Sequence, residues 1–260
     1  MAATTVQDAD IDRAKVLAAE ITGAKASTGP SRSAAVADLN KRFAGVDAAT
    51  FMRAMIEDVF PGRIAVVSSF GAEAAVLLHL VAQIDKTVPV IFLETGMHFP
   101  QTLSYRDKIT ALLGLEDVRS IAPDPADLAR EDPHDGLWQS DTDRCCHLRK
   151  VQPLDRALRE FDVWINGRKQ IHGGSRIRLP RVEASGRFVK INPLARWSRE
   201  DIEAAFEASG LPRHPMVEQG YTSIGCWPCT APASSAELRS GRWTDSAKTE
   251  CGIHLPSAAE

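Results

Sequence analysis

The chain has 260 residues, of which 44% are hydrophobic and 25% charged, and its formal net charge at pH 7 is −3. This composition excludes a disordered, collagen-like or disulfide-scaffold protein and favours one globular α/β domain with a substantial core. The acidic balance argues against a general nucleic-acid binder, so we expect no nucleic-acid partner.

The sequence shows no membrane or export signal. No uninterrupted apolar run reaches the roughly 18 residues of a membrane span. The N-terminal MAATTVQDAD lacks a basic segment followed by an apolar one. We therefore expect a cytoplasmic protein with no membrane partner. In a reducing cytosol, its five cysteines are more prone to bind metal or to react than to form structural disulfides.

Residues 1–48 are expected to be an N-terminal extension, helical and partly mobile. The stretches IDRAKVLAAEI and AAVADLNKRF have helical periodicity, and GAKASTGPSRS separates them. A short helix from Phe51 to Phe60 follows, and Pro61-Gly62 ends it. We expect residues 49–260 to form one domain, with a C-terminal catalytic tail at about 240–260.

Buried strands then alternate with helices. Apolar runs predict strands at 64–68, 88–93, 118–121 and 163–166, and the segments AAVLLHLVAQI and 100–113 predict helices between them. This alternation indicates an α/β fold in which a mostly parallel sheet carries helices on both faces. Ligands of such sheets bind beyond the carboxyl ends of the strands.

The remainder of the chain is expected to be peripheral to this sheet. Phe188 to Ile191 predicts a short strand, and Ser198 begins a helix that runs to Ser209 and ends at Gly210. From Leu211 onward the sequence is irregular, yet it contains three of the cysteines. Something other than secondary structure must order it.

Four cysteines have the pattern of a metal site, with an adjacent pair, 79 intervening residues and a CxxC motif. Groups of four thiolates hold either tetrahedral zinc or an iron-sulfur cluster. Adjacent cysteines are awkward zinc ligands because both sulfurs must lie about 2.3 Å from one ion, whereas a cluster offers a separate iron to each. The pattern favours one 4Fe-4S cluster per chain and leaves zinc, or no metal, open. The ligands would be Cys145, Cys146, Cys226 and Cys229.

Two strand ends predict a nucleotide site. The loop Ser68-Ser69-Phe70-Gly71-Ala72-Glu73 joins a buried strand to a helix, where backbone N–H groups and the helix dipole favour phosphate. Glu94-Thr95-Gly96 follows the next strand. An ordinary strand-to-helix turn is the alternative, since the Gly-Lys-Ser ending of a Walker loop is absent.

Basic residues cluster in the middle of the chain. Between Arg144 and Lys190 there are twelve Lys or Arg and four Asp or Glu, a net positive charge of eight. Gly167-Arg168-Lys169 follows a predicted strand, and Arg176 and Lys150 could join it in binding phosphate or sulfate oxygens. Surface salt bridges are the alternative for each of these side chains.

The fifth cysteine, Cys251, lies in the terminal KTECGIHL. A thiol reacts as thiolate and needs nearby positive charge, which Lys248, His254, Arg239 and Arg242 could supply. A buried inert cysteine is the alternative. The polar surroundings and Gly252 favour a nucleophile on a flexible segment.

Together these motifs resemble the assimilatory adenylylsulfate and phosphoadenylylsulfate reductases of the PP-loop adenine-nucleotide superfamily. The resemblance runs from about Ile64 to Leu255 and rests on SSFGAEAAVLL, FLETGMHFPQTLSYRD, CCHLRKVQPL, WINGRKQIHGGSR, HPMVEQGYTSIGCWPCT and KTECGIHL. It implies that Ser68, Ser69, Phe70, Gly71, Glu94, Thr95 and Gly96 hold the adenylate. It further implies that the phosphosulfate lies against Lys150, Gly167, Arg168, Lys169, Arg176, Arg239, Arg242 and His254.

The resemblance also implies a reaction. The Cys251 thiolate attacks the sulfur of the substrate, AMP leaves, and a thioredoxin or glutaredoxin releases sulfite from the resulting S-sulfocysteine. Members with all four cluster cysteines typically use adenylylsulfate, so we expect that substrate and a role in sulfate assimilation and cysteine biosynthesis. Use of the 3′-phosphorylated nucleotide, alone or in addition, remains the alternative.

Two less favoured functions come from other classes. An ATP-using PP-loop enzyme such as a tRNA thiolase would need a basic RNA-binding surface, which the acidic balance disfavours. A zinc-stabilised interaction module would leave Cys251 without a role. Formation of a homo-oligomer stays open.

Overall fold

A six-stranded sheet forms the centre of the protein in a computed structural model that describes residues 6–22, 30–244 and 248–254. The strand order is β3-β2-β1-β4-β6-β5, and only the β5–β6 pair is antiparallel. The predicted α/β fold with a mostly parallel sheet is therefore confirmed. The strands are β1 (Ile64–Val67), β2 (Val90–Leu93), β3 (Val118–Ile121), β4 (Val163–Ile165), β5 (Val182–Ser185) and β6 (Phe188–Ile191).

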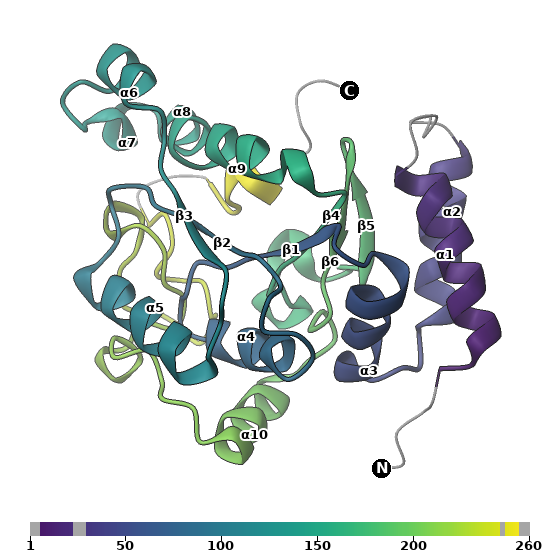
Figure 1. Cartoon of the computed structure of the whole chain (residues 1–260). Helices are drawn as coiled ribbons and strands as arrows, with labels where there is room; N and C mark the ends of the chain where they lie inside the picture. The colour runs from purple at the N-terminus through teal and green to yellow at the C-terminus, as the bar shows by residue number, and fades with distance from the viewer. Residues whose placement is uncertain (1–5, 23–29, 245–247, 255–260) are drawn as a thin grey trace.

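Helices cover both faces of the sheet, with α3, α4 and α10 on one side and α8 and α9 on the other (Figure 1). The first half of the chain contributes α1 (Asp8–Thr22), α2 (Pro30–Arg42), α3 (Ala48–Arg53), the π-helix η1 (Ala54–Val59), α4 (Ala74–Ala82) and α5 (Pro100–Leu113). The second half contributes α6 (Pro125–Glu131), α7 (Leu137–Ser140), α8 (Thr142–Cys146), η2 (His147–Val151), α9 (Gln152–Ala157), the 3₁₀ turn η3 (Leu158–Glu160) and α10 (Arg199–Ser209).

Successive side chains of a central strand point to opposite faces of the sheet and pack in two separate apolar clusters. Ile64 and Val66 of β1 join the larger apolar cluster, together with residues of α3, α4, α5 and α10. The alternate residues Ala65 and Val67 join the smaller cluster with Leu154 of α9. Both faces of the strand are thus buried, which explains why β1 is apolar at every position.

The N-terminal helices α1 and α2 pack against each other beside the β5–β6 edge (Figure 1). Leu17 and Ile21 of α1 and Leu39 of α2 are fully buried in the larger cluster. The helical character expected of residues 1–48 is confirmed for 8–22 and 30–42. Part of the segment that was predicted to be mobile, residues 1–5 and 23–29, lies outside the described residues. The division of the chain at residue 48 stays a prediction.

One expectation about the later segments was wrong. The strand at 188–191 is not peripheral, because β6 pairs with β4 inside the sheet and carries β5 on its outer side. The region 125–157 contains helices that periodicity did not predict. In α6 and α7 no residue is fully buried, and with seven and four residues both helices are too short to show a helical period.

The chain after α10 is irregular, as predicted, apart from short 3₁₀ turns at η6 (Val217–Gln219), η7 (Trp227–Cys229) and η8 (Gly252–His254). Side-chain contacts attach its first part to α5. The Tyr105 hydroxyl donates to the carbonyl of Pro212 over 2.8 Å, and Thr102 Oγ1 lies 3.1 Å from His214 Nε2. Within the described part of the chain, no helix is both long and apolar enough to cross a membrane.

Candidate active site

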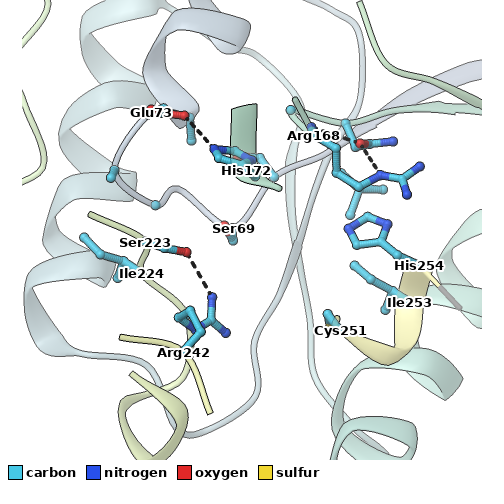
Figure 2. A pocket seen from close by; sticks show the side chains of 18 of the residues that line it. Ser69, Glu73, Arg168, His172, Ser223, Ile224, Arg242, Cys251, Ile253 and His254 are labelled. Atoms are coloured by element: carbon cyan, nitrogen blue, oxygen red, sulfur yellow. Dashed lines mark hydrogen bonds and ion pairs between the residues drawn. The ribbon is translucent and has the colours of Figure 1, made fainter. Parts of the chain in front are cut away.

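A cavity of about 210 Å³ lies at the carboxyl ends of β1, β2 and β4. Its walls come from the loop after β1, the segment after β4, the irregular residues 222–225 and the tail that carries Cys251 (Figure 2). This is the position that parallel α/β sheets offer to ligands.

Most of the predicted site residues meet in this cavity. Four predicted substrate-binding residues lie elsewhere: Phe70 is in the larger core cluster, Glu94 faces Arg106, Thr95 Oγ1 lies 3.3 Å from Cys226 Sγ, and Gly96 approaches Arg149. The predicted residues that line the cavity are Ser68, Ser69, Gly71, Lys150, Gly167, Arg168, Lys169, Arg176, Arg239, Arg242, Cys251 and His254.

The loop after β1 is shaped by a residue in the left-handed region. Phe70 has φ 48°, and its N–H donates to Ser68 Oγ over 3.2 Å. Its ring is fully buried and meets Phe92 edge-on at 5.7 Å. A Cβ on Gly71 would lie 3.0 Å from the carbonyl oxygen of Ile224. The loop therefore packs against residues 222–225 with no room for a side chain at Gly71.

One wall holds a buried charge cluster that the sequence reasoning did not single out. Glu73 Oε2 lies 2.8 Å from Lys169 Nζ and 3.3 Å from His172 Nε2 (Figure 2). Burial would raise the pKa of Glu73, but hydrogen bonding with His172 and the charge of Lys169 lower it to about 2. Lys169 also donates to the carbonyl of Gly167 over 2.9 Å. Lys169 is thus tied to the protein and partly neutralised.

Arg168 is held rigidly at the end of β4. Its Nε donates to Asn166 Oδ1 over 3.1 Å, its Nη2 donates to Asn192 Oδ1 over 3.2 Å, and it forms an ion pair with Glu183. Burial and the charge of Arg176 lower the pKa of Arg168 to about 10. A guanidinium with such a pKa still carries its full charge at neutral pH.

Arg242 extends from the irregular segment into the cavity opposite Cys251 (Figure 2). Its Nε donates to the carbonyl of Cys229 over 3.0 Å, and its Nη1 lies 3.5 Å from Ser223 Oγ. The guanidinium also lies against Gly225, where a Cβ would collide with it. Arg242 therefore joins the CxxC turn to the cavity wall.

The tail places a reactive thiol among cations. Hydrogen bonding with Cys146, together with the charges of Lys150 and Arg242, holds the pKa of Cys251 well below its ordinary value despite burial. Hydrogen bonding with Cys251 and burial raise the pKa of Cys146. The charges of Lys150 and Arg242 therefore favour the thiolate form of Cys251.

Aromatic stacking fixes the end of the tail. The His254 ring stacks on Trp164 of β4, with the ring centroids 5.6 Å apart and the planes inclined by 15°. Burial and the charges of Arg168 and Arg176 hold the pKa of His254 well below its ordinary value, so the ring is neutral. Ile253 packs against the apolar cluster of α9 and β4.

The remaining thiols gather beside the cavity. Cys145 and Cys226 share a small buried cluster with Met97, and Cys229 follows Cys226 by one turn of η7. Burial raises the pKa of Cys145 to about 11, with the Cys226 and Cys229 thiols adding to the rise. In the ranges that the structure describes, no three Cys, His, Asp or Glu side chains are arranged as ligands of one metal ion.

A buried cation accompanies the thiols. Burial would lower the pKa of Lys150, but the charges of Cys226, Cys251 and Cys146 raise it, so this ammonium is charged. Arg242 is surrounded by the same thiols and by Cys229. Four cysteines with buried cations beside them suit an anionic thiolate-ligated group.

Several cavity residues were not predicted as site residues. Glu73 and Glu250 are carboxylates in a site expected to bind anions, so charge reasoning passed over them. Trp164 looks like an ordinary core residue of a strand, and His98 shows no local signal. The unpredicted residues on the cavity wall include Glu73, Leu77, His98, Trp164, Asn166, His172, Thr222, Ser223, Ile224, Gly225, Glu250 and Ile253.

Comparisons with known proteins agree on one family. Residues 63–232 match the model described as "Phosphoadenosine phosphosulfate reductase domain". Proteins named adenosine 5′-phosphosulfate reductase are similar to this chain. The one from Mesorhizobium japonicum is 52% identical over 199 residues, covering 76% of this chain and 78% of that protein. The one from Chelativorans sp. is 50% identical over 196 residues, covering 75% and 80%.

Solved structures show the same fold. A phosphoadenylyl-sulfate reductase from Candida auris, in a phosphate complex, superposes with a TM-score of 0.65 at 27% identity, covering 79% of this chain and 98% of that one. An FMN adenylyltransferase from Candida glabrata gives a TM-score of 0.52 at 13% identity, covering 87% and 75%. The second likeness concerns the fold alone.

Proposed function

Because the chain belongs to the phosphoadenosine phosphosulfate reductase domain family, we propose that it is a thiol-dependent reductase that converts adenylylsulfate into sulfite and AMP. The observation that carries this proposal is the placement of Cys251, a thiolate on the tail, in the same cavity as Lys150, Arg168 and Arg242. The relatives that are 52% and 50% identical are named for adenylylsulfate, which favours that substrate over its 3′-phosphorylated form.

In the first step, the Cys251 thiolate attacks the sulfur atom of the bound sulfate group. A sulfur–sulfur bond forms, the bond between that sulfur and the bridging phosphate oxygen breaks, and AMP leaves with the electron pair. Negative charge grows on the phosphate and sulfonate oxygens as the bond breaks. Preplaced cations such as Lys150 and Arg242 stabilise this charge without having to move.

In the second step, an external dithiol removes the sulfonate. Its thiolate attacks Cys251 Sγ, the sulfur–sulfur bond breaks, and sulfite leaves with the electron pair. The second thiol of the donor then releases Cys251, so the dithiol is oxidised to a disulfide and supplies both electrons. A thioredoxin or glutaredoxin has this chemistry. The enzyme would act in the cytoplasm, in sulfate assimilation for cysteine biosynthesis.

The adenylate is proposed to lie against the loop after β1. Backbone N–H groups at Ser69 and Gly71 precede the N-terminus of α4, where a helix dipole favours phosphate. The cations on the opposite wall leave the phosphosulfate between that loop and Cys251. Four of the predicted nucleotide contacts would have to be made by residues that do not line the cavity, namely Phe70, Glu94, Thr95 and Gly96.

Cys145, Cys146, Cys226 and Cys229 are proposed to hold one 4Fe-4S cluster. The burial of Cys145, Cys146 and Cys226, the packing of Cys145 and Cys226 with Met97, and the charged Lys150 and Arg242 beside them support a thiolate-ligated anionic group. When bound, the cluster would supply structural and electrostatic support and no electrons. Cys146 would then leave its hydrogen bond with Cys251. Zinc, the alternative, would leave the purified protein colourless.

Mass spectrometry of protein incubated with adenylylsulfate in the absence of a dithiol tests the proposal. We expect a sulfonate adduct on the peptide that contains Cys251 and one AMP released per adduct. Cys251→Ser should form neither the adduct nor sulfite and should retain AMP binding, because the thiol supplies only the covalent step. Turnover of the 3′-phosphorylated nucleotide alone would make the protein a phosphoadenylylsulfate reductase. ATP conversion to AMP and pyrophosphate would instead indicate an adenylating enzyme.

A further inference from the structure

The described tail, Lys248–His254, is attached to the protein by a buried ion pair. Glu250 Oε2 accepts from Arg176 Nε over 2.6 Å, and Glu250 Oε1 accepts from Arg176 Nη2 over 2.7 Å. Both side chains are buried, with 6% and 7% of their surface exposed. This bidentate geometry is the strongest and most directional form of a carboxylate–guanidinium contact.

The pair leaves Arg176 few donors for another anion. Its Nη1 lies 3.1 Å from His172 Nδ1, so Nε, Nη1 and Nη2 all have partners within the protein. Arg239 is similarly engaged, because its Nη2 donates to the carbonyl of Thr249 over 3.1 Å and lies 3.6 Å from Glu250. Two cations expected to bind the substrate therefore hold the tail.

The same carboxylate orients the residue that reacts. Glu250 Oε1 accepts the backbone N–H of Cys251 over 2.9 Å in addition to its bond from Arg176. On the other side of Cys251, Ile253 packs on the smaller apolar cluster and His254 stacks on Trp164 (Figure 2). The thiol thus lies between an electrostatic attachment and an apolar one.

We propose that Glu250 and Arg176 are positioning residues that hold the tail closed and place the Cys251 thiol in the cavity. This assignment rests on the proposed function in taking Cys251 as the nucleophile. It gives Arg176 a tail-holding role in place of the substrate-binding role expected from the sequence. The substrate anion is then left to cations such as Lys150 and Arg242, for which no carboxylate lies within ion-pair distance among the described residues.

Thiol alkylation in the absence of substrate tests the attachment directly. The rate constant for iodoacetamide labelling of Cys251 is measured on the protein as purified, by mass spectrometry of the tail peptide, for wild type, Glu250→Gln, Arg176→Gln and the double variant. Each single substitution should raise the rate about tenfold or more, since loss of one partner of a buried ion pair exceeds the roughly 1.4 kcal/mol that a factor of ten represents. The double variant should be no faster than the faster single variant, because both substitutions remove one contact. Glu237→Gln, at an exposed position, is the matched control and should label like wild type.

Adenylylsulfate affinity separates a positioning role from substrate binding. In a Cys251→Ser background, Arg176→Gln should change the dissociation constant of adenylylsulfate by less than about threefold, and Glu250→Gln should leave that of AMP unchanged. With Cys251 present, both variants should lower kcat more than they raise KM, and Glu250→Asp should recover part of kcat. Thermal unfolding confirms that each variant is folded.

Unchanged labelling of Glu250→Gln, or rates that multiply in the double variant, would overturn the proposal. A tenfold weaker adenylylsulfate complex in Arg176→Gln would overturn it as well and would make Arg176 a substrate ligand. If wild type forms no sulfite from adenylylsulfate, the proposed function fails, but the labelling experiment still decides whether the ion pair holds the tail.

Discussion

Acidification should release the irregular C-terminal segment through one buried histidine. His214 is fully buried, its Nδ1 accepts the N–H of Met216 over 3.2 Å, and its Nε2 faces Thr102 Oγ1 at 3.1 Å. The hydrogen bond from Met216 requires a neutral ring with its proton on Nε2. Burial accordingly lowers the pKa of His214 from 6.5 to about 4.

The sign and size of the effect follow from proton linkage. Below pH 6.5 the unfolded state binds a proton at this histidine that the folded state does not bind, so stability falls as the pH decreases toward the folded pKa of about 4. Between pH 7 and pH 5 this single group should lower the free energy of unfolding by roughly 2 kcal/mol. His214 bonds to Met216, which packs with Ile224 of the cavity wall, so AMP binding should weaken over the same range.

Urea unfolding at pH 7 and pH 5 measures this contribution, with His214→Asn as the informative variant. Asn Oδ1 can accept the Met216 N–H but does not titrate, so the decrease in unfolding free energy between the two pH values should be smaller by roughly 2 kcal/mol than in wild type. His134→Asn, at an exposed position, should retain the wild-type pH dependence. An equal pH dependence in wild type and His214→Asn would refute the reasoning, because some other group would then carry the protons.

Three further outcomes follow from single contacts. Glu73→Gln should lower the free energy of unfolding by roughly 3 kcal/mol at pH 7, because it leaves buried Lys169 without its carboxylate. The difference in unfolding free energy from wild type should shrink as the pH falls from 4.5 toward 2, where Glu73 becomes protonated. A difference that is constant with pH would contradict this. Gly71→Ala should weaken AMP binding by about tenfold and lower the free energy of unfolding by about 1 kcal/mol, since its Cβ would lie 3.0 Å from the Ile224 carbonyl and displace the loop. A calorimetric titration that gives the wild-type affinity would exclude a tight fit there. Cys226→Ser should bleach the purified protein and lower its melting temperature, because the segment after α10 depends on the proposed cluster; an unchanged melting temperature would count against a structural role.

The central strands β1, β2 and β4 were predictable because they are buried at every position and therefore apolar throughout. The bounds of β3 and α5 coincide with the predicted 118–121 and 100–113. By contrast, β5 has one buried position, Val182, among its four residues at the sheet edge, and this gives no pattern that separates it from a turn. Local sequence predicts an element best where burial imposes a pattern on it, and β5 carries little of one.

The site was predictable only where local sequence places a residue. The loop after β1 and the segment after β4 reached the cavity as expected, because strand ends fix where they point. Thr95 also follows a strand end, yet Arg149 Nη1 donates to its carbonyl over 2.9 Å and its hydroxyl approaches Cys226. Contacts with residues more than 50 positions away turn this segment toward the thiols, and no local pattern records them.

The positive charge of the cavity explains the role of its two carboxylates. Six cationic side chains line it, and Glu73 and Glu250 are the carboxylates among its described lining residues. Each carboxylate forms an ion pair with a cation that was predicted from the sequence to bind an anion. Glu73 pairs with Lys169, and Glu250 pairs with Arg176. The two pairs lie side by side, since His172 contacts both Glu73 and Arg176. Lys150 and Arg242 remain as positive charge near Cys251 with no carboxylate at ion-pair distance among the described residues. An anionic substrate would therefore be drawn to the wall where the thiolate lies, since field lines concentrate in a cleft with charge of one sign.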